Sequence, residues 1–147
     1  LALVQPTHLH LGEKDWQQLQ VLRRLVRDLR WPVQIVPCPT LRERDGLPLS
    51  SRNAYLSESE RIQALALSQA LALAEKQLED SELEPVALLE ALKRRIEQEP
   101  SARIDYIELV DAQTLAPIED FSGPVLCAMA VFVGKTRLID NRVLKKR

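Results

Sequence analysis

DWQQLQVLRRLVRDLRWPVQIVPC, from Asp15 to Cys38, has the pattern of a helix that leads directly into a β-strand. Apolar residues recur at helical spacing over about Asp15–Arg30 and form one stripe: Trp16, Leu19, Leu22, Val26 and Leu29. The next run, Val33–Cys38, follows one proline, precedes another and is rich in β-branched residues, which is typical of a strand. We expect the apolar residues Leu1–Val4 to form an earlier strand. The segment therefore predicts a strand–helix–strand unit with parallel strands.

Two further helices are predicted after this unit. Ser57 and Glu60 have the spacing of a capping box, and the Ala- and Leu-rich residues that follow predict a long helix to about Leu78. Pro85 suits the first turn of another helix, and Pro100 marks its end. These two helices belong to a part of the chain whose composition differs from that of the first unit.

Three strands are predicted after the helices, at residues 103–110, 125–133 and 136–140, and Gly134 and Lys135 form a tight turn between the last two. Two helices and a small antiparallel sheet indicate an α+β domain. We expect residues 1–50 and 51–147 to form separate domains, and the whole chain to have an α/β fold.

The composition excludes several classes of protein. The chain has 147 residues, of which 46% are hydrophobic and 28% charged, as in a soluble protein with a core. Its net charge of −1 offers no long-range attraction to nucleic acid or to a membrane, and we expect neither as a partner. No apolar run approaches the length of a membrane span and no signal peptide is visible, so we expect a cytoplasmic protein. Cys38 and Cys127 lack metal-ligand spacing, and we expect both to be buried apolar residues.

DGLPLSSRN, from Asp45 to Asn53, has side chains suited to a polyphosphate. Gly46 permits a positive φ. Ser50 and Ser51 offer hydroxyl donors, and Arg52 offers a charged, planar fork that can bind phosphate through two hydrogen bonds. Taken alone, the same residues are equally typical of a polar loop that caps the next helix.

GEKDWQQL, from Gly12 to Leu19, is expected at a junction between a strand and a helix. Amides at a helix start attract anions, and Lys14 adds a full positive charge. Gln18 lies four residues later, so a helix would place both side chains on one face. Asp15 could cap the helix or help to hold Mg²⁺ together with phosphate oxygens. Two such loops, each after a strand, favour a nucleotide site.

The two segments together resemble the pantothenate synthetases, also called pantoate–β-alanine ligases. The similarity also covers Val4–Pro6 and GKTRLIDN, from Gly134 to Asn141, and it extends over nearly the whole chain. The resemblance implies a Rossmann-like nucleotidyltransferase unit followed by a C-terminal α+β lid. It further implies ATP as a substrate with Mg²⁺, pantoate and β-alanine as the other substrates, a pantoyl-adenylate intermediate, and a homodimer in the intact enzyme of the coenzyme A pathway. Some members of the family carry a fused cytidylate kinase.

The resemblance also implies roles for individual residues. Gln18 matches a glutamine that binds pantoate, and the backbone at Leu41 matches a contact to adenine. Asp15 remains a possible magnesium ligand. The ATP-binding positions are Gly12, Glu13, Lys14, Asp15, Leu41, Leu49, Ser50, Ser51 and Arg52. Among these, the catalytic contacts to the phosphates are expected from Lys14, Ser50, Ser51 and Arg52.

One element of the family has no match. The N-terminal His-x-Gly-His segment is absent, and His8 and His10 do not form it; we expect both histidines at the surface. We therefore expect a truncated, C-terminal portion of the ligase, with negligible activity by itself. Two alternatives remain open: a non-catalytic nucleotide-binding or interaction module, and an adenylyltransferase that acts on a different acid.

Overall fold

The computed structural model describes residues 1–78 and 83–145. Contacts within the chain divide it into two compact units, Leu1–Leu41 and Arg42–Arg147. The expected boundary after residue 50 thus lies within the second unit. Which segments act as an ATP-binding domain and which as a lid stays a prediction.

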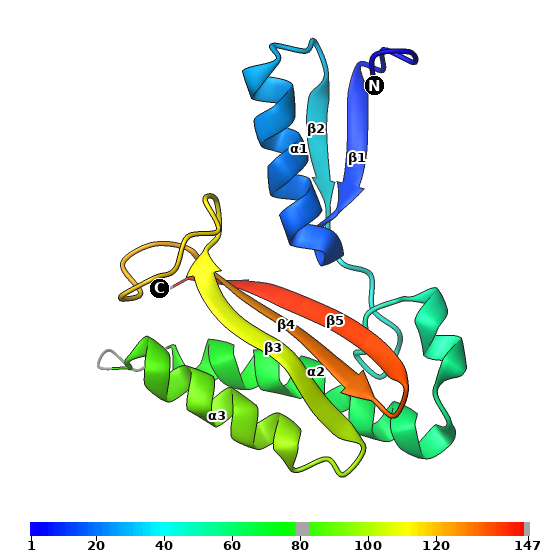
Figure 1. Cartoon of the computed structure of the whole chain (residues 1–147), viewed down its shortest axis with the longest axis vertical. Coiled ribbons are helices and arrows are strands. Elements are labelled where there is room, and N and C mark those ends of the chain that lie inside the picture. The colour runs from blue at the N-terminus through cyan, green and yellow to red at the C-terminus, as the bar shows by residue number, and fades with distance from the viewer. Residues whose placement is uncertain (79–82, 146–147) are drawn as a thin grey trace. The chain divides into compact units, whose positions relative to one another are not determined.

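The first unit is a strand–helix–strand unit (Figure 1). Strand β1 spans His8–Gly12, the short 3-10 helix η1 spans Glu13–Asp15, helix α1 spans Trp16–Asp28, and strand β2 spans Gln34–Cys38. The two strands are parallel, and His8 pairs with Gln34 while Gly12 pairs with Cys38. The predicted helix and its following strand are confirmed.

The expected strand at Leu1–Val4 is wrong. These residues form a turn, in which the Gln5 backbone N–H donates to the Leu1 carbonyl (2.8 Å) and Gln5 has a φ of 46°. The strand begins instead at His8, where polar and apolar residues alternate and the odd and even positions differ in exposure. Four consecutive apolar residues show no such period, so their composition alone does not distinguish a strand from a turn.

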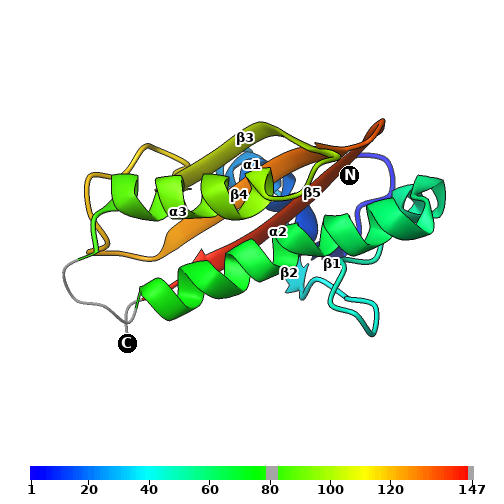
Figure 2. The same cartoon turned by 90° about the horizontal axis from the view of Figure 1, so that it is seen from below.

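The second unit packs two helices on one face of a three-stranded sheet (Figures 1 and 2). After η2 (Ser51–Tyr55) come helices α2 (Glu58–Gln77) and α3 (Pro85–Glu97). Strands β3 (Ala102–Asp111), β4 (Val125–Val133) and β5 (Thr136–Leu144) are antiparallel in the order β3-β4-β5. The predicted α/β fold class is confirmed, including the small antiparallel sheet.

Local sequence signals account for the ends of these elements. Ser57 caps α2 through a full capping box, because its side chain accepts from the Glu60 N–H and the Glu60 carboxylate accepts from the Ser57 N–H. Pro85 occupies the first turn of α3, where its missing N–H costs nothing. Gly134 turns the chain between β4 and β5 with a φ of 57°.

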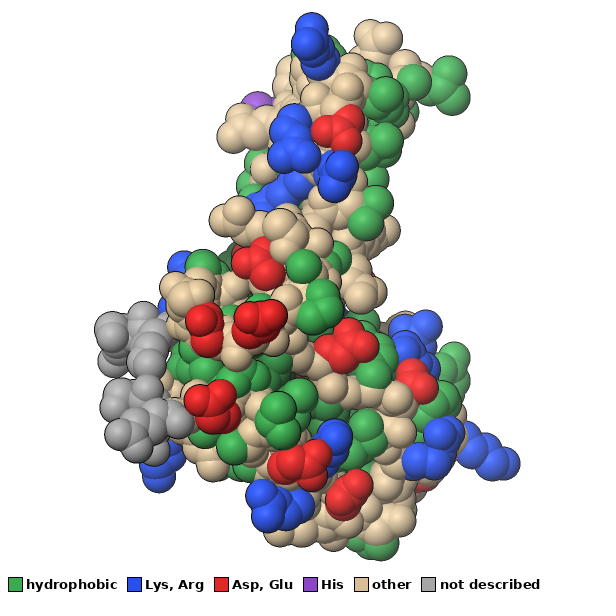
Figure 3. Space-filling model, turned by 60° about the vertical axis from the view of Figure 1, so that its left-hand side comes forward, with side chains coloured by type: hydrophobic (Ala, Val, Ile, Leu, Met, Phe, Trp, Pro, Cys, Tyr) green, Lys and Arg blue, Asp and Glu red, His purple; other side chains and the backbone are tan. Residues whose placement is uncertain are grey.

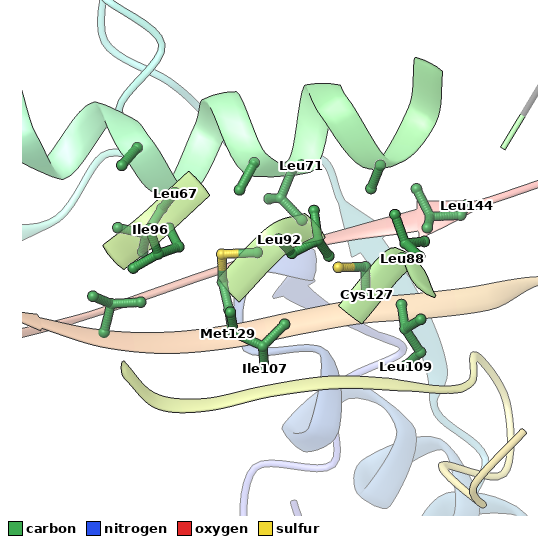
Figure 4. Close-up of a cluster of buried hydrophobic side chains, with 14 of the residues drawn as sticks. Leu67, Leu71, Leu88, Leu92, Ile96, Ile107, Leu109, Cys127, Met129 and Leu144 are labelled. Carbon is green, nitrogen blue, oxygen red and sulfur yellow. The ribbon is translucent and has the colours of Figure 1, made fainter. Parts of the chain in front are cut away.

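The hydrophobic core of the second unit lies between the sheet and the two helices (Figure 4). Alanines on α2 let the helix approach the sheet closely, and leucines of α3 fill the remaining space. The residues labelled in the close-up are Leu67, Leu71, Leu88, Leu92, Ile96, Ile107, Leu109, Cys127, Met129 and Leu144.

Both cysteines are free. Cys127 is fully buried, and burial raises the pKa of its thiol to about 12, so it behaves as an apolar core residue. Cys38 is only half-buried, so the expectation of burial is wrong for this residue. It lies at the last position of β2, which has helix α1 as its neighbour within the first unit.

Candidate functional site

The first candidate segment follows the carboxyl end of β1. Gly12 is the last residue of the strand and has extended backbone angles, and Glu13–Asp15 form the 3-10 turn that leads into α1. Leu41 lies three positions beyond Cys38, the last residue of the parallel strand β2. Both expected ATP contacts of this unit thus follow the same edge of the sheet, where open α/β sheets bind their ligands.

Lys14 and Gln18 do not share a regular helix face. Lys14 lies in the 3-10 turn, Gln18 lies in the first turn of α1, and the chain changes geometry between them at Asp15 (φ −99°, ψ 62°). Gln18 is exposed and Lys14 is half-buried. The expected i, i+4 geometry is therefore wrong.

Asp15 stands at the N-cap position of α1, but its side chain makes no capping hydrogen bond. One of the two predicted uses of Asp15 is thus not realised. Among the described residues, no group of three or more His, Cys, Asp or Glu side chains could hold a metal ion. Mg²⁺ commonly uses only one or two carboxylates together with substrate phosphates, and the exposed carboxylate of Asp15 fits that requirement.

Basic side chains gather on the surface of the unit that contains α1 (Figure 3). The exposed arginines of this unit are Arg24, Arg27 and Arg30. Arg24 and Arg27 bind Asp28 through their Nε atoms at 3.2 and 3.3 Å. These contacts hold the pKa of the Asp28 carboxyl below its usual range, with the hydrogen bond from Arg24 as the main cause.

His8 and His10 are exposed on β1, as expected. The Nδ1 atom of His10 lies 3.7 Å from the sulfur of Cys38. The described residues of the chain place no third metal-ligating side chain beside this pair.

The second candidate segment begins with a tight loop. The Glu43 N–H donates to the Leu47 carbonyl (2.8 Å), and Arg42 and Pro48 form an antiparallel bridge. Gly46 supplies the positive φ of 94° that the loop needs. Leu47 is buried in the core of the second unit and fixes the loop there.

The phosphate-binding candidates follow this loop. Ser50 is the N-cap of η2, and its hydroxyl accepts from the Arg52 backbone N–H at 3.2 Å. Ser51 and Arg52 are exposed, and no ion pair joins the guanidinium of Arg52 to any described residue. Ser50 thus caps the short 3-10 turn within the segment, whereas the next helix, α2, is capped by Ser57. The side chains of Ser51 and Arg52 are exposed to solvent.

Charged side chains that no local sequence signal indicated hold the loop of residues 42–48. Arg42 donates two hydrogen bonds to Asp140, at 2.8 and 2.9 Å, and a third to the Gly46 carbonyl at 3.0 Å. The Asp140 side chain is 1% exposed, so this pair is shielded from water. The only available signal was that Asp140 belongs to the matched GKTRLIDN segment, to which no role was assigned.

A second ion pair connects the loop to α2. Arg61 binds Glu43 and Asp45 through its Nη2 atom, each at 2.7 Å. The pKa of Glu43 is lowered, first by the hydrogen bond from Asn53 and then by that from Arg61. The pKa of Asp45 is lowered mainly by the Leu47 N–H, which donates to it at 3.1 Å, and the pKa of Arg61 is raised by both carboxylates.

Comparisons with known proteins agree with the motifs. The model of the pantoate–β-alanine ligase family matches residues 1–143. The chain belongs to the pantoate–β-alanine ligase family.

Three relatives illustrate the similarity. The bifunctional pantoate ligase/cytidylate kinase of Synechococcus sp. (strain RCC307) is 62% identical over 147 residues, which are 100% of this chain and 28% of the relative. The crystal structure of pantothenate synthetase from Thermus thermophilus is 40% identical with a TM-score of 0.91, over 98% of this chain and 52% of that one. A pantoate–β-alanine ligase from Francisella tularensis, complexed with β-γ ATP and β-alanine, is 32% identical with a TM-score of 0.68, over 97% and 46%.

The chain thus spans about half the length, or less, of these ligases. The family and the α/β fold follow from the comparisons. The residue roles remain predictions, because the comparisons do not test individual positions.

Proposed function

We propose that this chain is part of an enzyme that joins pantoate to β-alanine with consumption of ATP. The match of the family model to residues 1–143 carries the proposal, and both motif segments are present within it. The ATP and β-alanine bound to the Francisella ligase support the same substrates here. In line with the resemblance, we place the reaction in the cytoplasm and expect a homodimer. No helix within the described residues is long and apolar enough to cross a membrane.

The reaction proceeds in two steps. The pantoate carboxylate attacks the α-phosphorus of ATP, which forms pantoyl adenylate and expels pyrophosphate. The amine of β-alanine then attacks the acyl carbon of the adenylate, which forms the amide bond of pantothenate and releases AMP. Negative charge accumulates at phosphorus and on the leaving pyrophosphate, so positive charge and positioning supply most of the acceleration.

The residues of this chain divide these tasks. Lys14 contacts the phosphates at the reacting centre, and Gln18 binds pantoate through its side-chain amide. Ser50, Ser51 and Arg52 bind the triphosphate, and the Ser50 hydroxyl, which accepts from the Arg52 N–H, can still donate its own hydrogen to a phosphate oxygen.

The remaining contacts concern the nucleotide and the metal. The backbone near Leu41 contacts the adenine, and Glu13 and Leu49 complete the matched ATP segments. Asp15 would hold Mg²⁺ together with phosphate oxygens, and the ion would neutralise part of the phosphate charge. The space beside Gly12 is open, because a Cβ built there would meet no atom of the chain within 4 Å, and the phosphates can approach the backbone at this position.

Pyrophosphate exchange tests this function. The full-length protein that contains this chain is incubated with ATP, Mg²⁺, labelled pyrophosphate and one acid from a panel that includes pantoate. We expect exchange with pantoate alone, followed by AMP release when β-alanine is added. Exchange with a different acid would identify another adenylyltransferase. A folded protein that binds ATP but exchanges with no acid would support the non-catalytic module instead.

A further inference from the structure

Asn53 closes the base of the loop that carries the phosphate-binding candidates. Its side-chain Nδ2 donates to the Pro48 carbonyl at 3.0 Å and to the Glu43 carboxylate at 2.7 Å. The bond to Pro48 joins the two residues that flank Leu49–Arg52. Because Asn53 is only 8% exposed, water competes little for either bond.

The two contacts fix the orientation of the amide. Both neighbours are acceptors, so the NH₂ group must face them. The Oδ1 atom on the other side is buried and accepts no hydrogen bond from any described residue. All hydrogen bonds of this side chain therefore depend on its two N–H donors, and a carboxylate of the same shape cannot replace them.

Glu43 connects Asn53 to helix α2 and so to the hydrophobic core. Its other oxygen accepts from Arg61 on α2, and α2 supplies several fully buried residues to the hydrophobic cluster. On the other side of the loop, Arg42 binds Asp140 on β5 and the Gly46 carbonyl. The base of the loop is thus attached to a helix and a strand of the same packed unit.

We propose that Asn53 is a positioning residue for the ATP half-reaction: it holds Leu49–Arg52 in one backbone conformation, so that Ser51 and Arg52 meet the triphosphate already oriented. The inference rests on the proposed function. A loop fixed before binding loses less conformational entropy when it binds a ligand. Groups held by supporting hydrogen bonds also keep the geometry that charge stabilisation requires.

The first test is Asn53→Asp in the full-length protein. The substitution keeps the shape, removes both donors and places a second carboxylate beside Glu43. We expect kcat/KM for ATP in pyrophosphate exchange to fall about 10- to 100-fold. The kcat/KM for β-alanine should not change, because pyrophosphate has left before that step.

A compensating change separates this role from simple damage. In the double variant Asn53→Asp with Glu43→Gln, the new amide at position 43 can donate to the new carboxylate, while its oxygen still accepts from Arg61. We expect the double variant to regain at least about a third of the decrease in log(kcat/KM) for ATP that Asn53→Asp causes. The bond to Pro48 is not restored, so recovery should be incomplete.

Gln63→Met is the matched control. Gln63 also attaches a loop to α2, because its side-chain oxygen accepts from the Ser101 N–H at 2.8 Å. We expect this variant to lower the melting temperature but to leave kcat/KM for ATP unchanged. Equal losses of kcat/KM in Gln63→Met and Asn53→Asp would overturn the proposal, and so would wild-type kinetics in folded Asn53→Asp.

Hydrogen–deuterium exchange provides a readout that does not depend on catalysis. We expect amide exchange in a peptide covering residues 49–52 to be about tenfold faster in Asn53→Asp than in wild type or Gln63→Met. Unchanged exchange would refute the positioning role. If exchange is faster but wild-type protein adenylates no pantoate, the proposed ligase function fails and Asn53 is refuted as a residue of that reaction.

Discussion

The two units hold their candidate ATP segments in different ways. Among residues 1–41, all of which the structure describes, Leu19 is the only buried hydrophobic residue. The second unit has a continuous core, and ion pairs join the loop before Leu49–Arg52 to both α2 and β5. The first segment therefore depends on local turns at strand ends, whereas the second is attached to a packed domain.

This difference predicts that substitutions in the two units affect kinetics and stability in different proportions. A change at the candidate phosphate-binding side chains of the first unit should alter the kinetics with little effect on the free energy of unfolding, since little packing depends on them. A change in the side chains that support residues 42–53 should alter both the kinetics and the free energy of unfolding, because these side chains connect the segment to the core.

The largest effect on stability is expected for Asp140→Ala. The substitution leaves Arg42 facing a site in which the Asp140 side chain is 1% and the Arg42 side chain 23% exposed. Removing one partner of a shielded pair costs about 3 kcal/mol or more of unfolding free energy. Urea denaturation of this chain measures the loss. Arg137→Ala is the control, since its pair with Asp105 is exposed and should contribute less than about 1 kcal/mol. Equal losses of unfolding free energy in Asp140→Ala and Arg137→Ala would show that the shielded pair is no more important to stability than the exposed one.

Lys14→Ala should have the opposite effect: a large loss of activity and a small change in stability. Loss of one charge-assisted contact to phosphate corresponds to roughly 1.5–3 kcal/mol, or about 10- to 150-fold in kcat/KM for ATP in the full-length protein. The unfolding free energy should change by less than about 1 kcal/mol. Lys76→Ala, an exposed lysine of α2, is the control and should retain wild-type kinetics. If Lys14→Ala unfolds the protein while Lys76→Ala does not, the first segment is structural.

A pH dependence is expected for the contact between Glu43, Asn53 and Arg61. The folded pKa of Glu43 lies below its ordinary value of 4.5, so its ion pair stabilises the protein above that pH. The stabilisation is lost as the pH falls below 4.5 and Glu43 takes up a proton. Melting temperatures of wild type and Glu43→Gln should differ at pH 7 and converge in acid. A difference that grows as the pH falls would contradict the assigned contacts.

The smallest effect is expected for Arg24→Ala in α1. Its pair with Asp28 spans one helical turn, and the side chains are 76% and 51% exposed. A pair this exposed should contribute little to stability, and less again in salt. Thermal unfolding in low and high salt measures the change. A loss of stability as large as that of Asp140→Ala would show that α1 depends on surface charge.

Local signals in the sequence predicted most of the fold. The capping box of Ser57, the first-turn Pro85 and the turn at Gly134 act within a few residues, and each is confirmed. The turn at Leu1–Val4 was missed, because a short apolar run has no period that distinguishes a strand from an exposed segment.

The support of the second loop could not be predicted in the same way. Arg42 and Asp140 are 98 residues apart, and nothing in their local sequence indicates that they meet. The segment Asp45–Asn53 indicated that phosphate could bind, but it gave no sign that Asn53 binds Pro48 and Glu43. Residue types therefore led to the prediction of a phosphate site, whereas the hydrogen bonds that position the loop became visible only in the fold.

The account depends on one claim: the exposed guanidinium of Arg52, presented by the second unit, binds the triphosphate. Single-turnover formation of pantoyl adenylate by the Arg52→Ala variant tests this claim, at subsaturating ATP in the full-length protein. We predict a rate about 10- to 150-fold below wild type, an intermediate rate for Arg52→Lys, and a smaller effect on the β-alanine step. A wild-type rate in folded Arg52→Ala protein would contradict the account and exclude this loop from binding phosphate.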